Sequence, residues 1–160
     1  MSYTTQDIAD LREMTGMGLM DIKKALDEAG GDRAKALVVL KERGAKIMDK
    51  KSDRTAGEGV IEAYVHAGRI GVLVEVNCET DFVARSEIFK EFAHDLALQI
   101  SSMAPDSIEA LLEQPFIKDS KLSIADYLRE VTSKMGEKVV IGRFHRILLG
   151  ENVPAAVEEA

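Results

Sequence analysis

The sequence predicts an α+β protein in which an N-terminal module of three helices precedes a core built from a three-stranded antiparallel sheet packed with helices. Residues 1–55 carry apolar side chains at helical spacing, interrupted by glycines. Residues 58–77 and 138–149 instead alternate between the two faces of a strand. The expected boundaries are 1–55 for the module with the start of a linker, 56–150 for the core, and 151–160 for an acidic, disordered tail.

Caps and glycines mark the three helices of the module. Thr5 is placed to cap the first helix and Gly16 to end it, while Gly30 ends the second. Asp32 is expected to cap the third helix, with Gly44 just past its end. One apolar stripe per helix would form the module core: Ile8, Leu11 and Met14; Leu19, Ile22, Leu26 and Ala29; Ala36, Leu37 and Leu40.

The stretch 45–57 that follows is strongly charged. Its basic residues are Lys46, Lys50, Lys51 and Arg54, with Asp49 and Asp53 between them at helical spacing. A solvated linker helix is the favoured interpretation, and a basic contact to a partner is the alternative.

The core begins with a β-hairpin over 58–77, because two alternating segments flank the turn signal at 66–69. A helix over 86–103 follows, capped by Ser86 and stopped by Pro105. Its expected inward face consists of Ile88, Phe89, Phe92, Leu96 and Ile100.

The second half of the core contains a short helix, an extended segment, a longer helix and a third strand. The short helix is expected over 107–112, and 114–117 is expected to be extended because the residue before Pro115 avoids the helical region. The longer helix would end at Gly136. The strand over 138–149 is expected to alternate without interruption.

The composition excludes several classes of protein. A net charge of -7 argues against a general binder of nucleic-acid backbones, so no direct nucleic-acid partner is expected. The single cysteine, Cys78, allows no internal disulfide and fits a reducing compartment. No apolar run resembles a signal peptide or reaches the roughly 20 residues of a membrane span, so the expected location is the cytoplasm, without membrane contact.

The residues show no evident catalytic site. The chain lacks the GxxxxGK[ST] and GxGxxG patterns of phosphate loops. His66, His94 and His145 are not spaced as metal ligands, and one cysteine cannot complete a zinc site, so neither a metal nor a cofactor is expected. Cys78 is interpreted as a buried structural thiol rather than as a nucleophile, since no base is placed beside it. A binding or regulatory protein is therefore favoured over an enzyme.

Residues 77–83 form the most unusual stretch of the chain. They join a strand to the helix at 86–103, and they set an acid, Asp81, beside a bulky ring, Phe82. A helix cap followed by a core contact of the ring is one interpretation. The other is that a rigid junction displays both side chains for binding.

Three segments resemble the translation elongation factor Ts family. They are LREMTGMGLMDIKKAL at 11–26, RIGVLVEVNCETDFVA at 69–84 and KMGEKVVIGRF at 134–144. The resemblance implies a guanine-nucleotide exchange factor, not an enzyme, that binds elongation factor Tu with GDP and promotes GDP release in translation elongation. It also implies that the module is ubiquitin-associated-like and that the core is of the dimerisation type.

The same resemblance implies which residues meet elongation factor Tu. They match the family's wedge (Thr80, Asp81, Phe82 and Val83), the patch by which its module grips the GTPase (Leu11, Leu19, Met20 and Lys23), and contacts of its core (Met135, Gly136 and His66).

The family's wedge acts near the magnesium and phosphate site of the GTPase. Because GDP is held largely through its phosphates and Mg²⁺, a ring pushed between elements of the GTPase would weaken the binding of the nucleotide. Phe82 would supply that displacement, and Asp81 would add a negative charge.

The chain departs from the longer family members in two respects. It has room for one core half where they carry two, and its 104–122 region is short. Two copies would therefore pair to rebuild the full surface, giving a homodimer and a 2:2 complex. Rival interpretations are an adaptor that binds helical partners through residues 1–55 and a thiol enzyme that uses Cys78.

Overall fold

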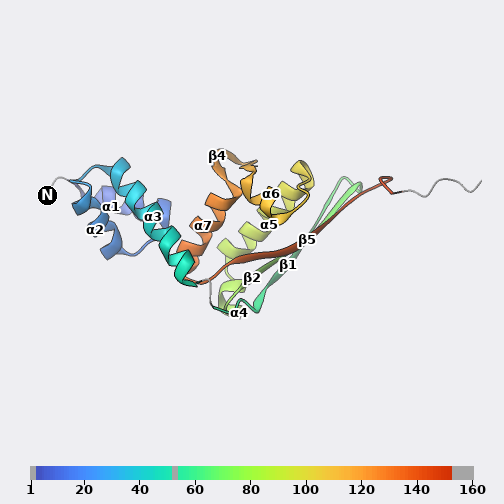
Figure 1. Cartoon of the computed structure of the whole chain (residues 1–160), viewed down its shortest axis with the longest axis horizontal. Helices are drawn as coiled ribbons and strands as arrows, with labels where there is room; N and C mark the ends of the chain where they lie inside the picture. The colour runs from blue at the N-terminus through green and yellow to red at the C-terminus, as the bar shows by residue number, and fades with distance from the viewer. Residues whose placement is uncertain (1–2, 52–53, 153–160) are drawn as a thin grey trace, which may run out of the picture.

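The chain folds into a helical module and a sheet-containing core that lie end to end. The computed structural model describes residues 3–51 and 54–152, with side chains described throughout except at 47–51. Figure 1 shows the three N-terminal helices at one end, the sheet at the other, and helix α7 (Ile124–Met135) between them. This is the α+β arrangement that the sequence predicts. Most of the expected tail at 151–160 lies outside the described residues.

Three helices make up the module: α1 at Thr5–Thr15, α2 at Leu19–Glu28 and α3 at Arg33–Lys51. Their buried side chains form a small core of their own, which consists of Leu11, Met17, Ile22, Ala25, Leu26, Ala36 and Leu40. Met14 and Leu19, which the apolar stripes place in this core, are about half exposed instead. Each lines a hollow at the edge of the module rather than the contact among the three helices.

The first helix is capped one residue earlier than predicted. The Thr4 hydroxyl accepts a hydrogen bond from the backbone N–H of Asp7 at 3.2 Å, and the Asp7 carboxylate accepts one from the backbone N–H of Thr4 at 2.7 Å. Such a capping box needs an acid or amide three residues after the cap, which Thr4 has and Thr5 lacks. The prediction for the third helix is confirmed, because the Asp32 carboxylate accepts from backbone N–H groups of its first turn.

Helix α3 does not end at Gly44. It continues to Lys51, so the predicted end of the helix is wrong. A Cβ at position 44 would lie 3.1 Å from the Ser133 Oγ of α7, and the glycine allows the two helices to approach closely.

The core sheet has the strand order β1-β2-β5, and all neighbouring strands are antiparallel. Its strands are Glu58–His66, Ile70–Cys78 and Val140–Leu148. His66 pairs with Ile70, so residues 67–69 form the turn between the first two strands, within the turn predicted at 66–69; Ala67 and Gly68 have positive φ, 50° and 66°. Helices α4 (Asp81–Ala84) and α5 (Glu87–Met103) pack against one face of the sheet.

Strand β5 contains a bulge, so the prediction of uninterrupted alternation is wrong. Its register with β2 shifts after Glu75 and leaves Gly142 without a cross-strand partner. A Cβ at position 142 would lie 2.5 Å from the Asn77 Oδ1, which favours glycine there. Because of the bulge, Ile141 and Phe144 both face the core although they are three residues apart.

Helix α5 supplies most of the core that faces the sheet. Its buried apolar side chains are Phe89, Phe92, Ala93, Leu96, Ala97 and Ile100. Ile88 is predicted on this inward face, but its side chain is exposed. It lies one position before the buried stripe that begins at Phe89. The predicted cap is confirmed, since the Ser86 hydroxyl accepts from the backbone N–H of Phe89 at 3.3 Å.

A short helix and a small ribbon connect α5 to α7. They are α6 (Ile108–Glu113), β3 (Pro115–Phe116) and β4 (Asp119–Ser123). The short helix is confirmed. The predicted extended segment is confirmed from Gln114 to Phe116, but Ile117 already lies in a turn, and strand β4 has no counterpart among the predictions. Its place is set by tertiary contacts: Phe116 stacks on Tyr127 with ring centroids 4.6 Å apart, and the backbone N–H of Ile117 donates to Gln99 Oε1 at 2.9 Å.

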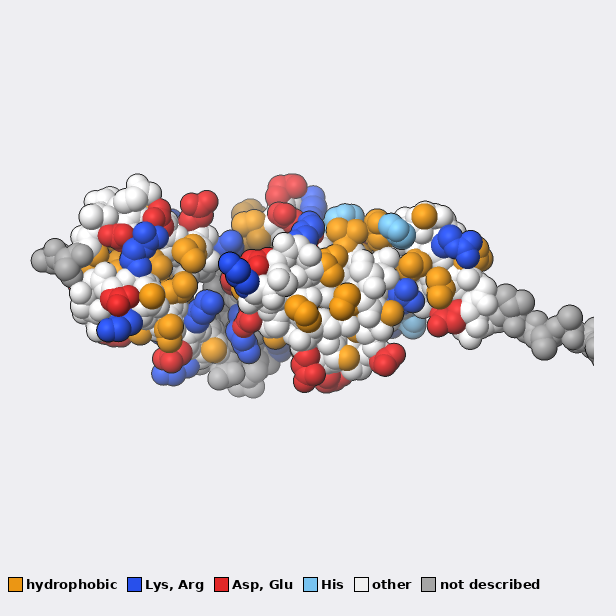
Figure 2. Space-filling view, turned by 90° about the horizontal axis from the view of Figure 1, so that it is seen from above, with side chains coloured by type: hydrophobic (Ala, Val, Ile, Leu, Met, Phe, Trp, Pro, Cys, Tyr) orange, Lys and Arg blue, Asp and Glu red, His pale blue; other side chains and the backbone are white. Residues whose placement is uncertain are grey.

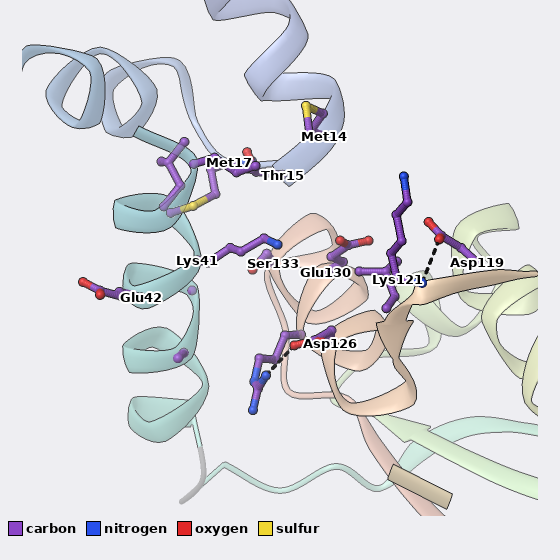
Figure 3. A pocket seen from close by; sticks show the side chains of 16 residues that line it. Met14, Thr15, Met17, Lys41, Glu42, Asp119, Lys121, Asp126, Glu130 and Ser133 are labelled. Atoms are coloured by element: carbon purple, nitrogen blue, oxygen red, sulfur yellow. Dashed lines mark hydrogen bonds and ion pairs between the residues drawn. The ribbon is translucent and has the colours of Figure 1, made fainter. Parts of the chain in front are cut away.

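The module meets the core where α1 and α3 pack against α7. At the closest approach, a Cβ on Gly16 would collide with the Lys134 side chain. Beside this contact lies a cleft of about 590 Å³. Figure 3 shows Met14 and Met17 on the module side of the cleft and Glu130 on the core side. Burial raises the pKa of the Glu130 carboxyl.

Candidate partner-binding site

The turn between β2 and α4 carries the residues expected to form a wedge, and we call residues 80–83 the wedge turn. Thr80 is the N-cap of α4, and its hydroxyl accepts from the backbone N–H of Val83 at 3.4 Å. Val83 is buried against the core, whereas the Phe82 side chain is 82% exposed. Thr80 is therefore a helix cap, but the core contact expected of Phe82 in that interpretation is wrong, because the ring faces solvent.

Asp81 stands on the outer surface beside the ring. Its carboxylate accepts a hydrogen bond from Arg85 Nη2 at 2.8 Å, one helical turn later. Both side chains are mostly exposed, so the ion pair is weakly held and Arg85 can release the carboxylate to another polar group. The wedge turn thus presents an acid and an aromatic ring side by side.

The loop between α7 and β5 is hydrogen-bonded to the start of the wedge turn. The Glu137 carboxylate accepts from the backbone N–H of Glu79 at 3.2 Å and from the backbone N–H and hydroxyl of Thr80 at 3.0 and 2.7 Å. The Glu79 carboxylate accepts from the backbone N–H of Lys138 at 2.7 Å. No local sequence pattern links Glu137 to Thr80, because the two lie 57 residues apart in the chain. The position of Glu137 within the resembling segment 134–144 is the one signal that could have drawn attention to it.

Cys78 is fully buried beneath the wedge turn. Its thiol donates to the backbone carbonyl of Thr80 at 3.1 Å. Burial raises the pKa of the thiol, and the negative charge of Glu137 raises it further. Both effects oppose formation of a thiolate, so Cys78 is the structural residue that the sequence predicts and the thiol-enzyme interpretation loses its nucleophile.

The structure brings Met135 and Gly136 next to the wedge turn. The Met135 Sδ lies 3.3 Å from the Ser86 Oγ, and Gly136 ends α7 with φ 71°. His66 is not brought there, because it lies in the hairpin turn at the other end of β2. That strand has nine residues, which span about 30 Å at roughly 3.3 Å per residue. The His66 Nδ1 lies 2.9 Å from the Tyr64 hydroxyl.

The contact patch expected on the module lies only partly on its surface. Leu19, Met20 and Lys23 of α2 are exposed, and Leu19 borders a shallow hollow between α1 and α2. Leu11 is 1% exposed and belongs to the module core. The surface of the patch therefore consists of the α2 residues, which Leu11 supports from inside.

Charged side chains of both signs are intermixed over the surface. On the face shown in Figure 2, Lys and Arg side chains are interspersed with Asp and Glu side chains over both the module and the core. At the start of the core, the Arg54 guanidinium lies 3.5 Å from a Glu79 carboxylate oxygen, and the Arg54 carbonyl accepts from Lys138 Nζ at 3.0 Å. The side chains of Lys50 and Lys51 lie outside the described residues. This face lacks the continuous basic surface of a nucleic-acid backbone binder.

Residues 3–51 and 54–152 contain neither a metal-binding cluster nor a membrane-spanning helix. Within these ranges no group of three or more His, Cys, Asp and Glu side chains is arranged to hold a metal ion. In the same part of the chain, no helix combines the length and apolar character needed to span a membrane.

Comparison with known proteins gives one consistent family. A family model described as "Elongation factor TS" matches residues 79–156. Elongation factor Ts of Carboxydothermus hydrogenoformans is 39% identical over 202 aligned positions, which cover 98% of this chain and 93% of the relative. The relatives from Coprothermobacter proteolyticus and Desulforamulus reducens are 39% and 41% identical, with 94% and 91% of this chain and 100% and 88% of the relative covered. Because 202 positions exceed the 160 residues of this chain, the first relative carries segments that this chain lacks.

Proposed function

The chain belongs to the elongation factor Ts family, the nucleotide-exchange factors of elongation factor Tu in translation elongation, and we propose that its exchange activity resides in the wedge turn. Members of this family are exchange factors and not enzymes. The activity therefore requires a surface that changes the GTPase rather than a group that reacts with a substrate.

The exposed ring of Phe82 is the observation that supports this proposal. In the isolated chain an exposed phenylalanine contributes little to the fold. Burying the ring against a partner would return about 2 kcal/mol of transfer free energy, which can be used to displace part of that partner. A neighbouring acid, Asp81, lies beside the ring in an ion pair that is easily exchanged.

The proposed mechanism is displacement at the magnesium and phosphate site of the GTPase. GDP is held largely through its phosphates and Mg²⁺, whose coordination geometry is strict. Phe82 would shift the backbone near that site, and Asp81 would place a negative charge there. Coupling between two ligands is reciprocal, so bound nucleotide weakens binding of the factor to the same extent. The factor therefore accelerates nucleotide exchange in both directions.

Further contacts are proposed on the module and on the core. Leu19, Met20 and Lys23 would grip the GTPase from the module, with Leu11 holding the helix that carries them in place. Met135 and Gly136 would extend the contact of the wedge turn, since they lie beside it. His66 would make a separate contact at the far end of the sheet.

Release of a fluorescent GDP from elongation factor Tu, in excess unlabelled GDP, tests the proposal. Phe82→Ala is expected to lower the exchange rate by about tenfold or more, as truncation of a central aromatic anchor does. Ile117→Ala is the matched control, because Ile117 is another exposed apolar side chain and lies in the β3–β4 ribbon, away from the wedge turn. Equal stimulation by the two folded variants would refute the role of Phe82.

We further propose that two copies pair through the uncovered face of the sheet. Helices cover one face, and the apolar side chains Ile61, Val65, Leu73 and Ile147 on the other face are each more than half exposed. An apolar sheet face is normally buried against a second layer. A second copy would supply that layer and give a 2:2 complex with elongation factor Tu.

Light scattering on the free factor tests the pairing. The wild type is expected to have the mass of a dimer, and Leu73→Glu is expected to give a monomer because it buries a charge in the centre of the contact. Val38→Glu introduces the same charge at an exposed position of the module and should leave the mass unchanged. A wild-type monomer with full exchange activity would end the dimer proposal.

We place the protein in the cytoplasm, the compartment of translation in the bacterial relatives. Residues 1–55 and 56–150 are proposed to act as module and core, with 151–160 as an acidic tail.

A further inference from the structure

At the base of the wedge turn, two segments from distant parts of the chain are joined by two carboxylates. Each carboxylate accepts hydrogen bonds from backbone N–H groups of the other segment. One oxygen of Glu137 lies 3.2 and 3.0 Å from the backbone nitrogens of Glu79 and Thr80, and its other oxygen lies 2.7 Å from the Thr80 hydroxyl. The Glu79 carboxylate in turn accepts from the backbone N–H of Lys138 at 2.7 Å. We call these four residues the carboxylate clasp.

We propose that Glu137 is a positioning residue for nucleotide exchange, which acts through Phe82 by fixing the direction in which the wedge turn presents the ring. The inference rests on the proposed function of the wedge turn. It adds to that function a residue whose effect is carried by the backbone of the turn rather than by its own contact with the nucleotide site.

The direction of the Phe82 ring depends on its backbone. The ring is mostly exposed, so packing within the chain does little to fix its orientation. Helix α4 has only four residues, and a helix of one turn has little stability of its own. The wedge turn is therefore held at one end by the buried Val83 and at the other by the hydrogen bonds of Thr80.

Thr80 is tied at each of its polar groups. Its backbone N–H and its hydroxyl donate to Glu137, its hydroxyl also accepts from the Val83 N–H, and its carbonyl accepts from the Cys78 thiol. Of these partners, Glu137 alone comes from another part of the described chain. Its removal would take away the bonds of Thr80 to the α7–β5 loop, while the local helix cap and the bond from the Lys138 N–H to Glu79 stay in place.

A carboxylate suits this task better than a neutral side chain. It offers two acceptor oxygens and no competing donor, so it can accept N–H and O–H groups together. Hydrogen bonds to an ionised acceptor are also shorter and stronger than neutral ones. A glutamine at position 137 would keep one acceptor oxygen but would turn an NH₂ group toward the remaining donors, so only part of the clasp would survive.

Loss of the clasp has a specific kinetic consequence. The module patch and the rest of the core would still bind elongation factor Tu. The loosened turn would have to be ordered on the partner before the ring could displace anything. The maximal rate of exchange should therefore fall by a large factor. The half-saturating concentration of the factor should rise by a smaller one.

Exchange kinetics over a range of factor concentrations measure both quantities. Glu137→Ala is expected to lower the maximal rate about tenfold and to change the half-saturating concentration less than about threefold. Glu137→Gln should retain intermediate activity, and Glu109→Ala, which removes an exposed acid of α6, should match the wild type. Because the alanine and glutamine variants at position 137 lose the same charge, a difference between them reports the hydrogen bonds.

Two further measurements separate positioning from general stability. Amide hydrogen exchange at Glu79 and Thr80 should be faster in Glu137→Ala, while strands β1 and β2 stay as protected as in the wild type. Adding Glu137→Ala to Phe82→Ala should lower the exchange rate little beyond Phe82→Ala alone, because a residue that acts through another is not additive with it.

The outcomes distinguish this inference from the function on which it rests. Wild-type kinetics in Glu137→Ala, or a loss that adds in full to that of Phe82→Ala, would overturn the role of Glu137 and leave the wedge turn unaffected. Normal exchange by Phe82→Ala would instead overturn the proposed function itself. If Glu137→Ala does not fold, Glu137→Gln carries the same comparison with Phe82→Ala.

Discussion

Phe82 and Phe89 lie seven residues apart and meet opposite environments. Phe89 is fully buried under the sheet, where truncation of a phenylalanine costs about 3–5 kcal/mol, whereas Phe82 projects from the surface. The difference arises because Phe89 falls on the inward stripe of a long helix, while Phe82 follows the N-cap of a helix of one turn. One residue type thus packs in the core at one position and projects into solvent at the other.

Cys78 provides a pH test at the same scale. Because burial raises the pKa of the folded thiol, its contribution to stability is present at low pH. The contribution is lost as the pH rises past the ordinary thiol pKa of about 8.5 toward the folded-state value. Urea unfolding at a series of pH values should therefore show a steeper loss of stability above that pH for the wild type than for Cys78→Ser, whose hydroxyl does not titrate there. Parallel pH profiles would contradict this prediction, and unchanged exchange by Cys78→Ser would exclude a thiol mechanism.

One buried charge contributes to the attachment of the ribbon of β3 and β4, besides the contacts of Phe116 and Ile117. The Asp95 carboxylate of α5 accepts from the Tyr127 hydroxyl at 2.8 Å and pairs with the Lys118 ammonium. The Asp95 side chain is almost completely buried, whereas Lys118 is half exposed. Burial, followed by the bond to Asp95, raises the pKa of the Tyr127 hydroxyl. These contacts fix the ribbon against α5 and α7.

Lys118→Met should therefore destabilise the chain. The substitution keeps the length of the side chain but leaves the buried Asp95 carboxylate without its cation. We expect a loss of about 2 kcal/mol, below the roughly 3–5 kcal/mol of a fully buried pair because Lys118 is half exposed. Lys121→Met in the same ribbon is the control and should change the free energy of unfolding by less than about 0.5 kcal/mol. Equal unfolding midpoints in urea for the two variants would show that the pair does not hold the ribbon.

Local sequence patterns predict most helices and strands correctly. They fail where contacts with residues distant in the sequence determine the structure. The apolar stripe from Phe89 to Ile100 and the cap at Ser86 are formed by residues close together in the sequence. For this reason the sequence predicts α5 well. Strand β4, the bulge at Gly142 and the continuation of α3 past Gly44 depend on contacts with other elements. The same holds for the candidate site: the wedge turn is visible in a short segment, but the residue that fastens it is not.

At the scale of the whole molecule, the contact between module and core rests on small residues. Gly16 and Gly44 let α1 and α3 approach α7 closely, and the cleft opens beside them. Gly16 also has φ 65°, which favours glycine for a second reason.

Gly16→Ala should separate the module from the core. The added methyl group would collide with Lys134, in addition to the strain of about 1 kcal/mol that alanine has at positive φ. Gly136→Ala is a matched control, because Gly136 has a similar φ of 71° and open space where the methyl group would lie. Small-angle X-ray scattering should show a larger radius of gyration for Gly16→Ala alone. An increase in both variants, or in neither, would mean that the close approach at Gly16 does not hold the module in place.

Helix α3 links the two proposed points of attachment, because it begins in the module and leads to the core. With 19 residues at 1.5 Å per residue, the helix is about 28 Å long. Under the proposed function, a GTPase bound by Leu19, Met20 and Lys23 of the module would meet the wedge turn at an effective concentration that can reach the millimolar range. Each contact could then have a low affinity by itself, because the other contact would keep the GTPase close to it. Weak individual contacts would also release readily, so that one molecule of the factor would serve many GTPase molecules in turn.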